Sequence, residues 1–468
     1  MAFYVSRDEF LRWLHLFVLA LGLAAGNFTL ERFIPGKINP DHIAQVRYLC
    51  LPVLLFLAFL RGRFHLYVCG HMKEAAASLA ILGVFVAYAA CLVPAAQGFL
   101  QFYDPLESYF LVFMYGLCAF FALREKRDAQ IFLIITFAIM IGILALYMAA
   151  ELVWGPHYLA TGYYYSRLFY IGFTLALIGL FHGLDKSDKG LAIAMAAVAF
   201  LFLYAGISTA MRASVLLYSL SLLACIPLMM ALRQYRRLGM ILLIAAVAYA
   251  AGLYQSGAQI AEKHKIYSSY VSPESPSAPV PMAESAPAVP AVSIPAPVIA
   301  EKTPCQRRID SFVETTKQQV RENQYTCVLN VPIRDYDSRL RLALTGLENV
   351  KSLWFGNGPG TYGFLDAARP DAAVYYTYPH NIYIGLYNET GLIGLGLVGL
   401  SILLVIGVCI GAFFSHNPTT IGIFSLIPAF FLLSGLIADD LYGVRYVWIA
   451  PFVLTALIAG SRRSDAAV

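Results

Sequence analysis

The amino-acid sequence predicts an all-α polytopic membrane protein with about 12 transmembrane helices and one large loop outside the membrane. Of the 468 residues, 59% are hydrophobic and only 13% are charged, whereas a soluble domain carries about 25% charged residues. The charged residues cluster between long apolar runs, most of them 17 to 25 residues in length. A helix of that length crosses the roughly 30 Å hydrocarbon core of a bilayer.

The apolar runs follow one another along the chain, apart from one long polar interval. The first run is long enough to span, and no small-residue cleavage site stands out beside it, so we expect a transmembrane helix there and no cleaved signal peptide. The expected spans lie at about residues 10–26, 43–60, 75–94, 108–123, 130–150, 168–184, 190–207, 213–231, 238–255, 389–414, 419–437 and 446–460.

The basic residues of the short loops predict the orientation of the chain, because cytoplasmic loops carry an excess of lysine and arginine. Alternate connections and the two termini hold fifteen basic residues, whereas the short connections on the opposite side hold six. We therefore expect both termini to be cytoplasmic. The six basic residues of the expected periplasmic side are Arg32, Lys37, Arg47, Arg167, Arg212 and Arg445.

The long polar interval divides the chain into three parts. We expect transmembrane helices one to nine, a large periplasmic loop and transmembrane helices ten to twelve, at residues 1–255, 256–380 and 381–468 respectively. Within the loop, residues 271–304 hold nine prolines among alanine, serine and valine, a composition typical of extended or disordered chain. Apolar residues recur at helical spacing in 305–326 and 338–351, which predicts two loop helices.

Two of the eight cysteines, Cys305 and Cys327, flank the first expected loop helix. In a periplasmic loop they would lie in an oxidising compartment, so a disulfide between them and two free thiols are both open alternatives. No two cysteines stand in a C-x-x-C pair. The sequence therefore suggests neither a zinc site nor a redox motif of that kind.

A candidate site begins where the large loop re-enters the membrane, in the sequence TYPHNIYIGLYNETGLIGLG at residues 377–396. Pro379 fits the start of a helix, and Asn381 is a good helix-capping residue. Between them, His380 has two interpretations. It either ends a loop at the polar interface, or it faces the periplasm as a catalytic base.

Three further features of the expected periplasmic side suit a bound phosphate. Arg212 ends a very short connection, where an arginine near membrane depth is costly, although a snorkelling interfacial arginine is the alternative. Arg339 begins the second loop helix and is either a phosphate ligand or a solvated charge like Arg341. The glycine-rich turn at residues 356–360 is either a tight loop or a nest of backbone N–H groups that meets phosphate or sugar.

These features together resemble a known family. His380 and Asn381 are followed by Glu389 and two glycines, and Arg339 and the glycine-rich turn lie upstream. This combination resembles the O-antigen ligase and O-antigen polymerase superfamily of membrane glycosyltransferases, and most of all an O-antigen ligase. The motifs cover about residues 338–400, and the expected topology matches in outline over the whole chain. The insert at residues 271–304 is not part of the family pattern.

The resemblance implies a GT-C-like membrane glycosyltransferase that acts in lipopolysaccharide biosynthesis. Such a ligase moves a glycan from undecaprenyl pyrophosphate to the lipid A–core oligosaccharide on the periplasmic face. The family's essential histidine and outer-face arginines correspond to His380, Arg339 and Arg212. The expected partners are the lipid-linked glycan donor, the lipid A–core acceptor and membrane lipids. We expect no cofactor, no bound metal and no nucleic-acid partner.

The chemistry of the residues suits this reaction. Charge develops on the pyrophosphate leaving group, and guanidinium groups remain charged and meet phosphate oxygens two at a time. Arg212 and Arg339 would then take the part of a divalent metal. The acceptor hydroxyl needs a base, which neutral His380 would supply near pH 7. Direct displacement with inversion of the anomeric centre is the mechanism that this arrangement predicts.

Glu389 has a structural and a functional interpretation. On one straight helix, His380 and Glu389 would point to opposite faces, about 13 Å apart along the axis. We therefore expect Glu389 to pair with another helix or to stabilise a helix break at Gly391, with a functional role for an intramembrane acid as the alternative. We expect four glycines to allow close packing of this helix against its neighbours: Gly391, Gly394, Gly396 and Gly399.

Four other charged residues of the expected periplasmic side are candidates for phosphate or metal binding. Arg47 and Arg167 lie near the starts of spans, where either would widen the phosphate site or anchor the chain at the interface. Asp439 and Asp440 are adjacent acids, which are more often solvated or paired with an arginine than ligands of Mg²⁺. The supporting site residues that the sequence suggests are therefore Asn381, Glu389, Arg47 and Arg167.

Two other functions stay open. An O-antigen polymerase or a protein O-oligosaccharyltransferase would share the site and differ in its acceptor, although a polymerase would be expected to carry two sizeable outer loops. A transporter of lipid-linked oligosaccharide would be expected to show internal repeats and polar groups at the bilayer midplane. Here the unusual polar groups lie at the outer boundary, which favours surface chemistry over transport.

Overall fold

The computed structural model describes much of the helical part of the chain and short pieces of the large loop. The described residues are 6–25, 40–65, 68, 70–93, 103–154, 163–208, 212–231, 233–271, 346–347, 350–359, 364–365, 375–376, 381–413, 427, 430–433, 435, 441 and 444–465. In several helical stretches, among them 40–45, 163–166, 212–214 and 256–271, only the backbone is described.

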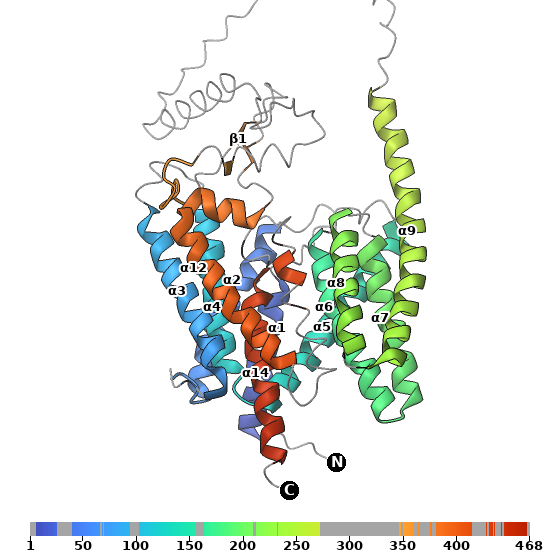
Figure 1. Cartoon of the computed structure of the whole chain (residues 1–468), viewed down its shortest axis with the longest axis horizontal. Coiled ribbons are helices and arrows are strands. Elements are labelled where there is room, and N and C mark those ends of the chain that lie inside the picture. The colour runs from blue at the N-terminus through green and yellow to red at the C-terminus, as the bar shows by residue number, and fades with distance from the viewer. Residues whose placement is uncertain are drawn as a thin grey trace, which may run out of the picture.

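Long helices account for nearly all of the described residues (Figure 1). They are α1 (Arg7–Ala25), α2 (Pro40–Leu60), α3 (Lys73–Cys91), α4 (Tyr103–Ala122), α5 (Lys126–Trp154), α6 (Tyr163–Asp185), α7 (Lys189–Ser208), α8 (Arg212–Ala231), α9 (Tyr235–Val271), α12 (Ile382–Phe413) and α14 (Tyr446–Asp465). A short 3-10 helix, η2 (Gly70–Met72), precedes α3. Within the region expected to be the large loop, β1 (Phe364–Leu365) pairs antiparallel with β2 (Tyr375–Tyr376).

The protein is a helical membrane protein. Among the described residues, six helices are long and apolar enough to cross a bilayer, and three shorter helices are also apolar. Helices suit this environment because each backbone N–H finds its partner within the same segment. The expected span at residues 419–437 lies largely outside the described residues, and each of the other expected spans coincides with a helix.

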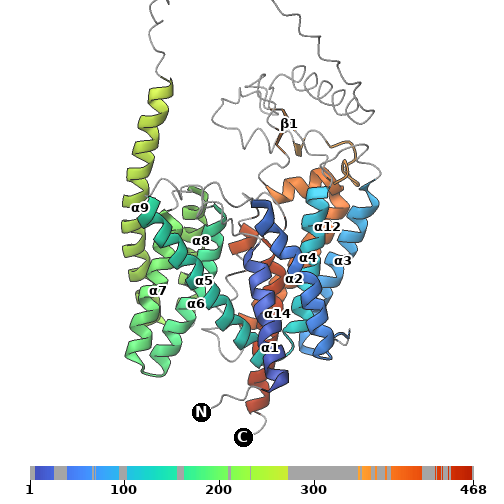
Figure 2. The ribbon, with the colours of Figure 1, turned by 180° about the vertical axis from the view of Figure 1, so that it is seen from behind.

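The bundle has two distinct ends, which Figures 1 and 2 show from opposite sides. At one end, here called the terminal face, α1 begins, α2 ends and α14 ends. At the other end, here called the loop face, β1 and the described turn at residues 350–359 lie above α3 and α12. α12 packs against α3 and α14, whereas α6, α7 and α9 form a second group of neighbours.

A polar contact inside the bundle joins α3, α12 and α14. The hydroxyls of Ser78 and Ser401 each donate to the other's backbone carbonyl, at 3.0 and 2.9 Å. The indole Nε1 of Trp448 donates to the Ser401 oxygen at 2.8 Å. All three residues are buried. Small hydroxyl residues allow such helices to approach closely and to bond across their interface.

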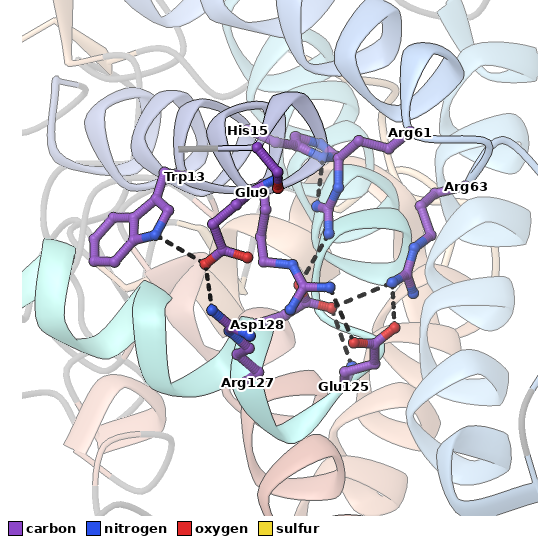
Figure 3. Close-up of polar contacts among 10 residues, drawn as sticks. Glu9, Trp13, His15, Arg61, Arg63, Glu125, Arg127 and Asp128 are labelled. Carbon is purple, nitrogen blue, oxygen red and sulfur yellow. Dashed lines mark hydrogen bonds and ion pairs between the residues drawn. The ribbon is translucent and has the colours of Figure 1, made fainter. Parts of the chain in front are cut away.

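At the terminal face, a buried carboxylate gathers arginines from two other segments of the chain (Figure 3). Asp128 of α5 is 0% exposed. Its carboxylate lies 2.9 Å from a guanidinium nitrogen of Arg61 and 3.5 Å from one of Arg12. It also accepts a bond from the backbone N–H of Glu125 at 3.2 Å, so that it caps the start of α5. This network ties α1, the end of α2 and α5 together.

Two helices extend beyond the apolar spans expected for them. α9 does not end near residue 255 but continues to Val271, because no proline interrupts the chain before Pro273. The first part of the interval expected to be a loop is therefore helical. α12 begins at Ile382, directly after the expected cap Asn381 and seven residues before the expected apolar span at 389–414. Its first part runs across the loop face before the helix turns down along α3 (Figure 1).

The expectation that the α12 glycines allow close helix packing finds no support at two of them among the described residues. A Cβ atom built at Gly396 or Gly399 has no neighbouring atom within 4 Å among the described residues. At Gly394 it would lie 2.0 Å from the hydroxyl of Thr390 in the same helix and 3.3 Å from Phe85 of α3. Gly391 contacts a loop and not a helix, as described below.

Candidate functional site

The candidate site centres on a break in α12, at Gly391. This residue has φ 65° and ψ −166°, a conformation that divides the helix into an upper part and a long lower part. Only glycine adopts this backbone conformation readily, since it has no Cβ atom. The break lies directly after Asn388, Glu389 and Thr390, all of which are buried.

A helix break in an apolar environment exposes backbone groups that need new partners. The turn at residues 353–358 supplies them through two donors and two acceptors. The loop carbonyls take the N–H groups below the break, and the loop N–H groups take the carbonyls above it. The four bonds are Leu392 N–H to Leu353 O at 2.9 Å, Ile393 N–H to Trp354 O at 3.2 Å, Asn357 N–H to Asn388 O at 2.8 Å and Gly358 N–H to Glu389 O at 2.9 Å. They replace two bonds that an uninterrupted helix would make within itself.

The turn and the break approach each other so closely that both need a glycine. A Cβ atom at Gly391 would lie 2.3 Å from the carbonyl carbon of Trp354. A Cβ atom at Gly356 would lie 2.6 Å from the carbonyl carbon of Glu389, and Gly356 also has a positive φ of 70°. Main chain meets main chain at this point, so neither neighbour can move aside as a flexible side chain would.

Side chains reinforce the contact from both partners. The amide of Asn388 donates to the carbonyl of Gly346 at 2.7 Å. The side-chain oxygen of Asn357 accepts from the N–H of Lys351 at 2.7 Å. The hydroxyl of Tyr88, from α3, donates to the carbonyl of Thr390 at 3.0 Å. The turn, α3 and the break in α12 therefore form one hydrogen-bonded unit at the loop face.

The interpretation of residues 356–360 as a nest for phosphate does not hold for the three described N–H groups at the start of the turn. Gly356 donates to the carbonyl of Ser352 at 2.8 Å, and Asn357 and Gly358 donate to carbonyls of α12. These donors are already used within the protein. The alternative, a tight loop, describes what the structure shows for residues 356–359, while Gly360 lies outside the described residues.

Glu389 lies just above the break and contacts a different helix. Its carboxylate accepts a hydrogen bond from the hydroxyl of Tyr109, on α4, at 2.6 Å, and Glu389 is only 4% exposed. The ring of Tyr109 packs edge-on against Phe85 of α3, with centroids 4.9 Å apart. This geometry fits the structural interpretation of Glu389, because the acid is paired with another helix beside the Gly391 break.

Asn381 is the N-cap of α12, as expected. Its side-chain oxygen accepts from the backbone N–H groups of Tyr383 and Ile384, at 3.0 and 3.1 Å. Ile382 N–H donates to the carbonyl of Gly435 at 2.9 Å, and the hydroxyl of Tyr383 donates to the carbonyl of Leu432 at 2.7 Å. The first turn of α12 is thus fixed by its own cap and by the segment that precedes α14.

Arg47, in the first half of α2, lies in an ion pair. Its guanidinium is 2.7 Å from the carboxylate of Glu107 on α4, and the hydroxyl of Tyr48 also bonds to that carboxylate. The guanidinium carbon stands 4.9 Å from the centre of the Tyr48 ring. The negative charge of the Glu107 carboxylate neutralises the Arg47 guanidinium, which would otherwise attract the pyrophosphate of the glycan donor. This geometry therefore favours the anchoring role over the phosphate-binding role.

Arg167 is enclosed within the bundle. It belongs to α6 and is only 2% exposed. One turn further along α6, the ring of Tyr170 stacks on Phe430 with centroids 3.7 Å apart. An arginine that anchors a helix at the interface is expected to stay in contact with water, so the burial of Arg167 does not favour the anchoring role.

Arg445 is a buried arginine that sequence reasoning counted only as one of six outer charges. It is 0% exposed, and its Nε donates to the carbonyl of Leu23 at 3.1 Å. Leu23 lies in the last turn of α1, whose final carbonyls have no partner within the helix. Arg445 therefore caps α1 with a positive charge at the negative end of the helix dipole. The apolar residues around Arg445 in the sequence could have indicated burial.

Several predicted residues lie outside the described residues. These are His380, Arg339, Asp439, Asp440, Cys305 and Cys327, together with residues 272–304 of the insert at 271–304. Arg212 begins α8, but only its backbone is described. Asn381 and Glu389 lie at opposite ends of the upper part of α12. The structure places Arg47 and Arg167 on other helices.

Within the described parts of the chain, no group of three histidine, cysteine or acidic residues is arranged to hold a metal ion. No model of a known protein family matches this sequence, and no curated protein matches it either. The fold establishes a helical membrane protein with a broken helix held by a loop at one face.

Proposed function

We propose that this protein is a membrane glycosyltransferase of the O-antigen ligase type. It transfers a glycan from undecaprenyl pyrophosphate to the lipid A–core oligosaccharide, at the periplasmic face of a bacterial inner membrane. In this proposal, the loop face is the periplasmic face. The twelve-span topology, the periplasmic loop and the metal-independent, inverting mechanism belong to the same proposal.

The observation that carries the proposal is the His380–Asn381…Glu389 motif at the start of α12. Asn381 caps the helix, Glu389 is bonded to α4, and the break at Gly391 is closed by the turn at residues 353–358. The segment that directly follows His380 is therefore held at both ends. A catalytic base benefits from such rigid support, since misplacement by about 1 Å lowers a rate by as much as 100-fold.

His380 acts as the general base that takes the proton of the acceptor hydroxyl as it attacks the anomeric carbon. The bond from that carbon to the pyrophosphate oxygen breaks in the same step, and Arg339 and Arg212 stabilise the charge that remains on the leaving group. The anomeric configuration inverts. Asn381 and Glu389 support the segment and do not touch the reacting atoms.

The experiment is a transfer assay with purified protein in detergent. The donor is undecaprenyl-pyrophosphate glycan, the acceptor is rough lipopolysaccharide, and EDTA is present. We expect lipopolysaccharide to gain the glycan with inverted configuration. Donor that elongates on itself would identify the polymerase, and transfer to a protein acceptor would identify the protein O-oligosaccharyltransferase. Transfer that requires added Mg²⁺ would refute metal independence and would make Asp439 and Asp440 candidate ligands of that ion.

Two variant pairs test the residue roles. His380→Ala should abolish transfer, whereas His182→Ala, an exposed histidine at the terminal end of α6, should leave it intact. Arg339→Ala should lower the rate and weaken donor binding, with Arg341→Ala as its matched control. Full transfer by folded His380→Ala protein would remove the base assignment, and retained anomeric configuration would refute direct displacement.

A further inference from the structure

An open apolar groove lies between α1 and α5, away from the α12 break. Its volume is about 570 Å³, and apolar side chains from the two helices line it. Phe10, Trp13 and Phe17 contribute from α1, where they are 57%, 40% and 45% exposed. Ile134 and Ala138 contribute from α5, and both are exposed. Spacings of three, four and seven residues place each set on one face of its helix.

One end of this groove is polar and lies at the terminal face. The indole Nε1 of Trp13 donates to the carboxylate of Glu9 at 3.2 Å, and Arg127 donates to the same oxygen at 2.7 Å (Figure 3). Arg127 lies seven residues before Ile134, so it shares the α5 face that lines the groove, about 10 Å along the axis. Its side chain is 63% exposed, and most of its five N–H donors can meet another group.

The charge around this end is positive. The segments at residues 7–12, 61–63 and 124–128 carry seven basic side chains and four acidic ones. Buried Asp128 and neighbouring Glu125 are occupied by Arg12, Arg61 and Arg63. The basic residues that remain exposed near this end are Arg7, Lys126 and Arg127, and the acidic Asp8 is exposed as well. Arg127 is paired with Glu9, but at 63% exposure it keeps N–H donors open to solvent, unlike Arg47, whose side chain is 20% exposed.

We propose that the groove between α1 and α5 binds an anionic phospholipid. One acyl chain lies along Phe17, Ile134 and Ala138, and the phosphate of the headgroup meets Arg127 and Lys126. From Arg127 to Ile141, α5 rises about 21 Å, which suits one leaflet of roughly 15 Å plus a headgroup. Ile141 is also exposed, at 39%, so the apolar surface continues along the path of the chain.

The positive rim favours a lipid over a second copy of the protein. A second copy would bring the same basic residues to the same place, where they would repel one another. An anionic headgroup is attracted by basic residues near a membrane surface, and its acyl chain can contact the apolar side chains that line the groove. The site is independent of the glycosyl transfer proposed above.

The test is native mass spectrometry of the delipidated full-length protein, titrated with phosphatidylglycerol or phosphatidylcholine. We expect phosphatidylglycerol to bind the wild-type protein more tightly. Ala138→Trp fills the groove and should weaken binding of both lipids about 10-fold. Arg127→Gln should weaken phosphatidylglycerol binding about fivefold. It should weaken phosphatidylcholine binding less, because the choline group already offsets the charge of that lipid's phosphate.

Matched variants control for general effects of the substitutions. Ala197→Trp changes an exposed alanine on α7, and Arg236→Gln changes an exposed arginine at the start of α9. Both should bind phosphatidylglycerol as the wild type does. Equal binding by Ala138→Trp and wild type would overturn the proposal. A dimer that Ala138→Trp abolishes would also overturn it, because a second copy of the protein would then occupy the groove. Inorganic phosphate that competes with the lipid at equal concentration would overturn it too, because the basic residues alone would then bind anions.

Discussion

At the scale of single residues, backbone conformation decides which side chains the α12 break tolerates. Gly391 and Gly356 are required for two reasons that act together. Each has a positive φ, and each would carry its Cβ atom into the main chain of the other segment. By contrast, Gly396 has open space around it among the described residues. Glycines of α12 therefore differ in whether they can be replaced by a residue with a Cβ atom.

This difference predicts the effect of alanine at each position. Gly391→Ala should lower the free energy of unfolding by about 1–3 kcal/mol from backbone strain alone, before the contact with Trp354 is counted. Gly396→Ala should leave stability unchanged or raise it by about 0.5–1 kcal/mol, since it replaces glycine within a helix. Thermal or denaturant unfolding in detergent measures both. Equal stability of the two variants would contradict the geometry of the break.

A second prediction concerns the bond from Tyr109 to Glu389. Tyr109→Phe removes the donor and leaves the buried acid with one bond fewer, which should cost about 1–2 kcal/mol. Glu389→Gln keeps an oxygen that accepts from Tyr109, so its cost should be smaller. Tyr254→Phe is the control, because Tyr254 is 82% exposed on α9. If Tyr109→Phe unfolds like Tyr254→Phe, then Tyr109 does not hold Glu389.

At the scale of elements, the ends of helices are completed by distant parts of the chain. The turn at residues 353–358 provides partners to both halves of α12, and Arg445 at the start of α14 caps α1. In both cases backbone groups that would be unpaired in an apolar environment obtain charged or main-chain partners. The helices are therefore coupled through their ends as well as through their apolar faces.

Arg445 allows a direct test of this coupling. Arg445→Met removes the donors to the Leu23 carbonyl and should cost about 1.5–3 kcal/mol, the range for a hydrogen bond to a charged group. Arg445→Lys keeps a positive charge at the end of α1 and should lose less. Arg236→Met, at an exposed position, provides the comparison. Unfolding curves would argue against the cap if all three variants behaved alike.

At the scale of the whole molecule, the two faces of the bundle have different chemistry. The loop face carries the broken helix and the motif segment, and the terminal face carries the arginine-rich network around Asp128. Burial alone would raise the pKa of the Glu125 carboxyl. The hydrogen bond and charge of Arg63, with the charges of Arg12 and Arg61, outweigh burial and lower that pKa below its ordinary value of 4.5.

The lowered pKa of Glu125 predicts a pH dependence. A carboxyl whose pKa is lower in the folded state contributes stability that is fully present above the unfolded-state value, about pH 4.5, and is lost as the pH falls through the folded-state value. The wild-type melting temperature should therefore fall more steeply below about pH 4.5 than that of Glu125→Gln. Glu74→Gln, at an exposed position in the first turn of α3, should follow the wild type. Parallel curves for wild type and Glu125→Gln would exclude this contribution.

Sequence reasoning located the helices because the signal is local. Apolar runs of spanning length identify a helical membrane protein without knowledge of any contact. Asn381 was recognisable as a cap for the same reason, since its partners are two and three residues away. The end of α9 was missed because its apolar run stops near residue 255, while its helical backbone continues without a breaker as far as Val271.

The site was predictable in its motif and not in its contacts. Glu389 was expected to pair with another helix, yet nothing in the sequence indicates that the partner is Tyr109. The glycine-rich turn suggested a phosphate nest because its spacing alone cannot show that α12 already accepts its N–H groups. The roles of His380, Arg339 and Arg212 in catalysis stay predictions that the transfer assay decides.

The sequence by itself determined that this protein lies in a membrane as a bundle of helices, because hydrophobicity and helix length act within each segment. Only the tertiary structure decided how the bundle is completed. It paired the turn at residues 353–358 with the break at Gly391, and it enclosed Arg445 against the end of α1. Those contacts join residues far apart in the chain, and they exist only once the apolar faces have packed and the remaining polar groups must find partners.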